Sequence, residues 1–86
     1  MIGQKTALFV AVIVDSKGVS IHIPDLDMIQ HGPDYVTAFA DACMHVEAIH
    51  AYNASRGITQ EIQTTFEDVA AMCKGKEDFT TCIVVG

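Results

Sequence analysis

Positive charge is scarce in this sequence: five Lys and Arg residues stand against eleven Asp and Glu, for a formal net charge of −6. Binding to nucleic-acid phosphates or to anionic membranes depends on clustered Lys and Arg, so this balance argues against both as general partners. The acidic net charge favours a basic protein as the partner of this chain. Half of the residues are hydrophobic, which excludes a disordered chain and indicates that another chain buries some of the apolar surface.

Long hydrophobic runs and patterned cysteines are also missing. The longest apolar run, residues 7–14, is too short to span a membrane. No cleavage signal follows it, so a signal peptide is not expected. The cysteines, Cys43, Cys73 and Cys82, match no disulfide framework and are typical of free thiols in a reducing cytoplasm. The length of 86 residues predicts a single domain, residues 1–86.

Four strands are predicted. Residues 7–14 are rich in β-branched residues, which indicates a strand buried on both faces and central in a sheet. The turn residues 15–18 and the alternating apolar residues of 19–23 predict an antiparallel hairpin. Residues 28–31 indicate a short third strand and residues 79–85 a last one.

Two helices are predicted between the third and last strands. Asp34 can cap a long helix that runs to about Ser55, with a core-facing stripe formed by Tyr35, Phe39, Ala42, Val46 and Ile49. A capping box at residues 65–68 indicates a short helix over 66–73. The order of elements predicts an α+β fold, in which the long helix packs on a three-stranded antiparallel meander with a further strand, and a short helix is added.

The opposite face of the long helix has unusually few charged residues. It presents Ala40, Met44, Ala48 and Ala51, and residues 35–55 contain no Lys or Arg. One interpretation is an Ala-rich helix exposed to solvent. The other is a face that packs on a second subunit, a partner or the later helix. On the second interpretation, a charge at Ala48 should disrupt assembly more than folding.

No catalytic, cofactor-binding or metal-binding residue is predicted. His45 and His50 are five residues apart and point away from each other on a helix, so they do not match a zinc pattern. The sequence contains no Gly-rich phosphate loop and no Gly-x-Ser-x-Gly turn, although a Cys–His dyad stays open. Acidic residues near the strand ends suit turns and caps better than a two-metal site: Asp15, Asp25, Asp27 and Asp34.

Short motifs in a characteristic order resemble the HicB-like antitoxin family. The resemblance covers about residues 5 to 85, and its motifs are Val14-Asp15-Ser16-Lys17-Gly18, Ile23-Pro24-Asp25-Leu26, Gly32, Ala38-Phe39-Ala40-Asp41-Ala42 and Thr65-Phe66-Glu67-Asp68-Val69. It implies a partial RNase H-like fold and a protein that forms dimers or higher oligomers. It also implies that the protein neutralises HicA, a small basic toxin that binds and cleaves RNA.

The sequence departs from the family pattern at three places. Asp27-Met28-Ile29 replaces the usual Pro-Gly-Cys. Many members carry a C-terminal DNA-binding segment, whereas none is expected here after Gly86. A true RNase H has a metal-binding Asp in its first strand, whereas residues 7–14 contain no carboxylate, so nuclease activity is not expected.

Three functions remain to be weighed. The first is a non-catalytic, protein-binding antitoxin, with Asp25 and Asp27 as candidate partner contacts. The second is an RNA-associated protein that uses the sheet and the few cations, which are Lys5, Lys17, Arg56, Lys74 and Lys76. The third is a small enzyme whose site the sequence does not reveal.

Overall fold

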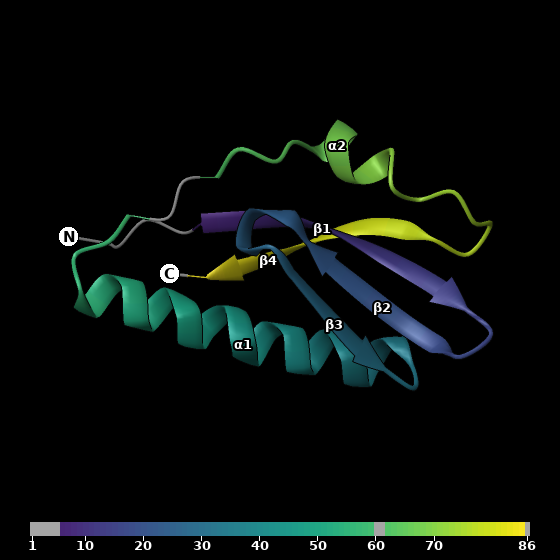
Figure 1. The fold of residues 1–86 in the computed structure, drawn as a ribbon, viewed down its shortest axis with the longest axis horizontal. Helices are drawn as coiled ribbons and strands as arrows, with labels where there is room; N and C mark the ends of the chain where they lie inside the picture. The colour runs from purple at the N-terminus through teal and green to yellow at the C-terminus, as the bar shows by residue number, and fades with distance from the viewer. Residues whose placement is uncertain (1–5, 60–61, 86) are drawn as a thin grey trace.

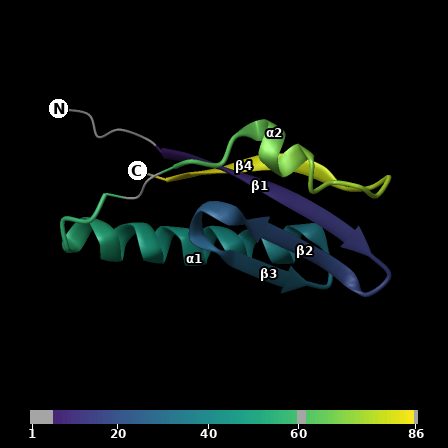
Figure 2. The same cartoon turned by 45° about the horizontal axis from the view of Figure 1, so that its top comes forward.

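The computed structural model describes residues 6–59 and 62–85. Its elements are, in chain order, β1 (Thr6–Asp15), β2 (Gly18–Ile23), the short 3-10 helix η1 (Pro24–Leu26), β3 (Met28–Gly32), α1 (Tyr35–Ser55), α2 (Phe66–Ala70) and β4 (Phe79–Val85). The strands form one antiparallel sheet in the order β3-β2-β1-β4. Figures 1 and 2 show α1 along one face of this sheet and α2 on the other. The predicted α+β fold is confirmed.

The β1–β2 hairpin closes as its turn residues predict. Asp15 pairs with Gly18, and only two residues lie between them. The Asp15 carboxylate accepts hydrogen bonds from the backbone N–H groups of Lys17, at 2.7 Å, and of Gly18, at 3.1 Å. Gly18 has a φ of +141°, a conformation that glycine alone adopts at little cost.

The core lies between the sheet and α1. Its strand residues alternate along β1, β2 and β4, as expected for one face of a sheet, and are Leu8, Val10, Val12, Val19, Ile21, Ile23, Ile83 and Val85. From α1 the buried residues are Ala38, Ala42 and Val46. The predicted stripe was therefore off centre: Tyr35, Phe39 and Ile49 are only half-buried. Small residues occupy the centre because the helix comes very close to the sheet there. A Cβ added to Gly32 would lie 2.9 Å from that of Ala38.

The prediction that β1 is buried on both faces was correct for one face only. Leu8, Val10 and Val12 are buried against α1. On the outer face Ala11 is buried, but Ala7 is exposed and Phe9 is half-buried. The reason is that α2 is too short to cover this face.

The short helix α2 ends at Ala70 rather than at Cys73 as predicted. Its capping box is present as predicted. After Ala70 the backbone N–H groups of Met72 and Cys73 bond three residues back, to the carbonyls of Val69 and Ala70. This tighter turn ends the helix, so only Val69 is buried from α2.

Asp78 connects the start of β4 to the end of β1. Its carboxylate oxygens accept from the backbone N–H groups of Val14 and Gly75, each at 2.9 Å. These bonds, that of Val14 first, hold the pKa of the Asp78 carboxyl below its usual value. The ionised carboxylate therefore stabilises the folded chain.

Replacing Asp78 with Asn should lower the urea midpoint of unfolding at neutral pH, because an amide offers one oxygen in place of two. The folded-state pKa is depressed, so the stabilisation is present above the unfolded pKa of about 4. It is lost as the pH falls through the folded value. The difference between the variant and the wild type should therefore shrink below about pH 4. Glu77→Gln removes the same charge from the same loop and is the control. Equal effects of the two variants would contradict a role for the two hydrogen bonds.

Candidate interaction surfaces

The outer face of α1 is the side of the helix that points away from the sheet. The four residues predicted to form it, Ala40, Met44, Ala48 and Ala51, are all exposed. Val36 lies on the same side by helical spacing. Val36 is 75% exposed and Met44 is 66% exposed. These five residues are called the α1 outer face below.

The α1 outer face is apolar and carries negative charge only. Glu47 falls within it by helical spacing and is exposed, and Asp41 is half-buried at its flank. At the start of the helix, Asp34 accepts from the N–H of Thr37 at 2.8 Å, which lowers the pKa of the Asp34 carboxyl. An exposed helix normally carries both signs of charge on its solvent side. This surface therefore differs from an ordinary solvated one.

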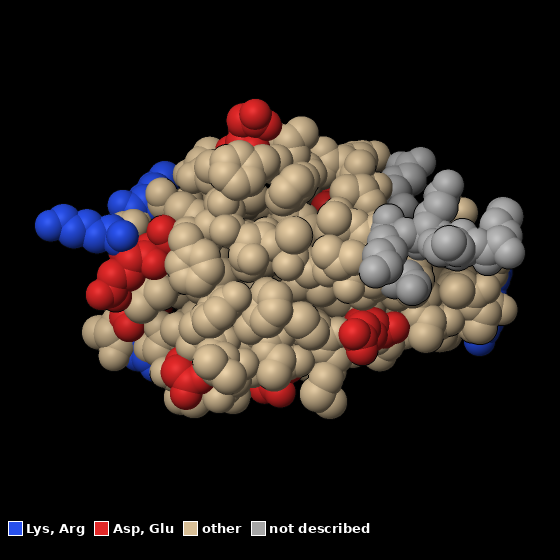
Figure 3. All heavy atoms as spheres, turned by 180° about the vertical axis from the view of Figure 1, so that it is seen from behind, with Lys and Arg blue, Asp and Glu red and all other residues tan. Residues whose placement is uncertain are grey.

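Basic side chains lie toward the ends of the molecule. Lys17 lies in the β1–β2 turn, and Lys74 and Lys76 lie in the loop before β4, so these three share the end of the sheet with Asp15, Glu77 and Asp78. At the far end of α1, Arg56 stacks on the Tyr52 ring, 5.0 Å from its centroid. Figure 3 shows uncharged side chains across the middle of the rear side, with Lys and Arg toward its two ends. Lys5 lies outside the described residues.

The two predicted partner contacts in the loop after β2 have different surroundings. The Asp25 carboxylate accepts from the backbone N–H groups of Gln63, at 2.9 Å, and Thr64, at 3.0 Å. It therefore ties the segment after α1 to the turn after β2. Asp27 is exposed, and its backbone has the left-handed conformation, with a φ of 50°. Of the two, only Asp27 presents an exposed side chain.

The sheet brings together one polar pair that the sequence did not reveal. Ser20 and His31 are opposite each other on β2 and β3, and Ser20 Oγ lies 3.0 Å from His31 Nδ1. Both side chains lie on the sheet face that α2 only partly covers. The third strand was predicted without a register, so no signal in the sequence could pair these residues.

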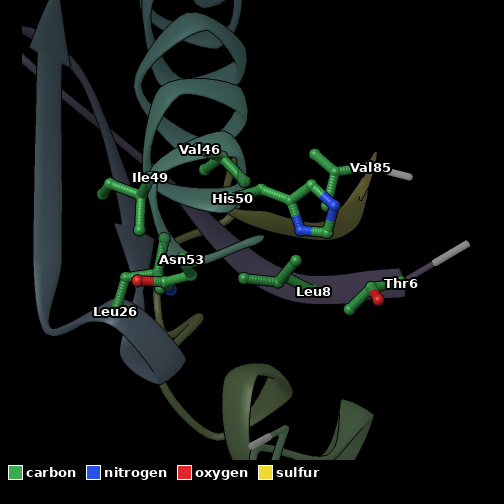
Figure 4. A pocket seen from close by; sticks show the side chains of 8 residues that line it. All are labelled: Thr6, Leu8, Leu26, Val46, Ile49, His50, Asn53 and Val85. Atoms are coloured by element: carbon green, nitrogen blue, oxygen red, sulfur yellow. The ribbon is translucent and has the colours of Figure 1, made fainter. Parts of the chain in front are cut away.

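A small pocket lies under the C-terminal part of α1 (Figure 4). It is lined by Thr6, Leu8, Leu26, Val46, Ile49, His50, Asn53 and Val85, and His50 points across it toward Val85 and Leu8. Its volume of about 20 Å³ is enough for a single water molecule.

The thiols of Cys43 in α1 and of Cys73 after α2 both have a raised pKa. Burial, and to a lesser extent the charge of Glu47, raises the pKa of the Cys43 thiol. Burial, followed by the charge of Asp78, raises that of Cys73. A raised pKa lowers the fraction of reactive thiolate. Among the described residues, no three His, Cys, Asp or Glu side chains are placed to hold a metal ion.

No helix in the described part of the chain has the length and apolar character that crossing a membrane requires. Comparison with family models, with curated proteins and with solved structures found no match to this chain. The HicB-like resemblance therefore stays a prediction.

Proposed function

We propose that this chain is a non-catalytic protein that binds a small basic protein through the α1 outer face. In its specific form, the proposal makes that partner an RNA-cleaving toxin of the kind neutralised by HicB-like antitoxins. The observation that carries the proposal is the α1 outer face itself, which is an exposed apolar surface on a 21-residue helix in a chain of net charge −6.

The apolar residues of this face supply the attraction at close range. Val36 and Met44 are largely exposed in the free chain. Burying apolar surface contributes about 25 cal/mol per Å². Met is also able to adapt its shape to a partner surface. The alanines between them allow a partner to approach the helix backbone closely.

The acidic residues favour a partner with a positive net charge. Glu47 lies within the face, and the helix has no Lys or Arg between Tyr35 and Ser55. Complementary charge mainly raises the rate of association and excludes partners of like charge. Binding should therefore be faster for a basic protein and should weaken as salt is added.

The proposal predicts that a small basic protein is encoded beside this chain's gene, and the test is co-expression of the two, followed by titration of the purified pair. Ala48→Arg should weaken the complex about tenfold or more, because it places a bulky, unpaired cation in the contact. Ser16→Arg makes the same charge change in the β1–β2 turn and should leave affinity unchanged. Both variants should keep the wild-type unfolding midpoint, since both side chains are exposed.

RNA cleavage by the partner gives the functional readout. The wild-type chain should suppress cleavage at equimolar amounts, and Ala48→Arg should fail to do so at the same concentration. Absence of a basic neighbour, or equal binding by the two Arg variants, would overturn the proposal.

The alternative of an RNA-associated protein rests on Lys17, Lys74 and Lys76 at one end of the sheet. Three carboxylates share that end, so attraction of phosphates there should be weak. Titration of labelled single-stranded RNA at low salt should give no binding. A shift that decreases with added salt would favour the alternative instead.

A further inference from the structure

The strand β4 forms one edge of the sheet, beside β1. β1 pairs with all seven residues of β4, from Thr6 with Val85 to Val12 with Phe79. Among the described residues, no strand pairs with the other side of β4. Its sequence, Phe-Thr-Thr-Cys-Ile-Val-Val, contains no charge, proline or glycine. An edge of this kind is a template for another strand, and proteins normally protect such edges.

The opposite edge strand, β3, has features that protect it from pairing with another strand. β3 has five residues and includes Gln30 and His31. It begins after the left-handed Asp27 and ends at Gly32, directly before Pro33. Short length, polar side chains and a nearby proline all discourage further pairing. β4 has seven residues, its polar side chains are limited to Thr80 and Thr81, and it contains no proline.

Apolar side chains next to the β4 edge are also exposed. Val84 is 51% exposed and Phe79 is 39% exposed, and Cys82 between them is exposed as well. Phe79 belongs to a group of rings that reaches from α1 to this edge, with its centroid 5.2 Å from that of Tyr35. The edge therefore offers unpaired backbone groups together with apolar surface.

We propose that β4 pairs with β4 of a second copy of this chain, antiparallel and about a two-fold axis at Cys82. Cys82 is the central residue of the strand, so this register pairs the whole strand. It sets Phe79 opposite Val85 of the second copy and the two Cys82 residues opposite each other. The two sheets become one continuous sheet of eight strands.

The chemistry of β4 itself favours pairing with a second copy of this chain. An antiparallel pair of identical strands is self-complementary and closes after two copies. Because β4 carries no charge, no like charges meet, although each chain has a net charge of −6. The described Lys, Arg, Asp and Glu residues all lie outside the strand.

This inference goes beyond the proposed function and does not depend on it. The two-fold axis is perpendicular to the sheet, so both α1 helices lie on one side of it. The α1 outer face points away from the sheet in each copy and stays free for a partner. Loss of the dimer and loss of partner binding can therefore be measured separately.

The first test is sedimentation of the purified chain alone over a wide range of concentration. The wild type should sediment as a dimer, and Cys82→Lys should raise the dimer dissociation constant roughly tenfold or more, because two ammonium groups meet across the axis. Ile29→Lys is the matched control. Ile29 is 52% exposed and lies on the protected β3 edge, so the dimer should persist.

The second test is oxidation with diamide, in which two thiols lose two protons and two electrons to form one disulfide and diamide is reduced to the hydrazine. Opposed residues of antiparallel strands have Cα atoms about 4.5–5.5 Å apart, within disulfide range. The wild type and the Cys43→Ser/Cys73→Ser variant should give a crosslinked species of twice 9.3 kDa. Cys82→Ser should give none.

The outcomes separate the possibilities. A wild type that stays monomeric, crosslinks that persist without Cys82, or a Cys82→Lys chain that dimerises like the wild type would each overturn the proposal. If Cys82→Lys loses its folded circular dichroism spectrum, Val84→Lys replaces it, since Val84 is half exposed on the same strand. A monomer that binds an extended peptide of another protein at β4 would also overturn it.

Discussion

Replacing Ile21 with Ala is expected to lower the free energy of unfolding by about 2–5 kcal/mol. Ile21 is fully buried in the middle of β2, between Val12 on β1 and Gln30 on β3. Truncation removes buried methyl and methylene groups and leaves a cavity that the packed strands can only partly close. For a domain of this size, such a loss is a large part of the total stability.

The measurement is urea unfolding at one fixed protein concentration, because the proposed dimer would make stability depend on concentration. Ile29→Ala makes the same chemical change on the neighbouring strand, where the side chain is 52% exposed. It should cost less than about 1 kcal/mol. Similar losses for the two variants would show that the face of the sheet toward α1 is not the core.

Replacing Gly18 with Ala should lower the free energy of unfolding by about 2–4 kcal/mol, for two separate reasons. The backbone φ of +141° is unfavourable for any residue with a side chain. In addition, the new Cβ would lie 2.5 Å from the backbone carbonyl oxygen of Gly32. Because that oxygen belongs to β3, relief requires β2 and β3 to shift apart.

Gly57→Ala separates the two reasons. Gly57 also has a positive φ, of 69°, but a Cβ there would meet nothing within 4 Å. Its cost should be about 1 kcal/mol, the penalty of the left-handed backbone alone. Thermal and urea unfolding of both variants provide the comparison. If Gly57→Ala is as destabilising as Gly18→Ala, the contact with β3 is not the cause.

Elements with strong local signals were predicted closely. The helix α1 begins after Asp34 and ends at Ser55 as expected, because a capping residue and a following glycine act within one turn of the chain. The last strand has the predicted bounds, 79–85. The extent of burial was predicted less well. Ala7 is exposed although the sequence of β1 suits burial on both faces, since burial depends on how much surface α2 can cover.

The candidate surfaces also include parts that local patterns predicted and parts that they did not. Helical spacing alone placed Ala40, Met44, Ala48 and Ala51 on one exposed face, because the period of a helix is a local property. The Ser20–His31 pair and the bonds of Asp25 join residues that are distant in the sequence. No local pattern specifies such contacts.

The sequence by itself determined the α+β class, the order of its elements, the acidic charge and the charge-poor side of the long helix. Each follows from composition or from a period of two or 3.6 residues. The sequence also predicted that β1 is central in the sheet, and the structure confirms it, but only the tertiary structure decided that β4 lies beside β1 at an open edge. Strand order depends on which surfaces pack together across the whole chain, and residues such as Cys82 become part of an edge only once that order exists.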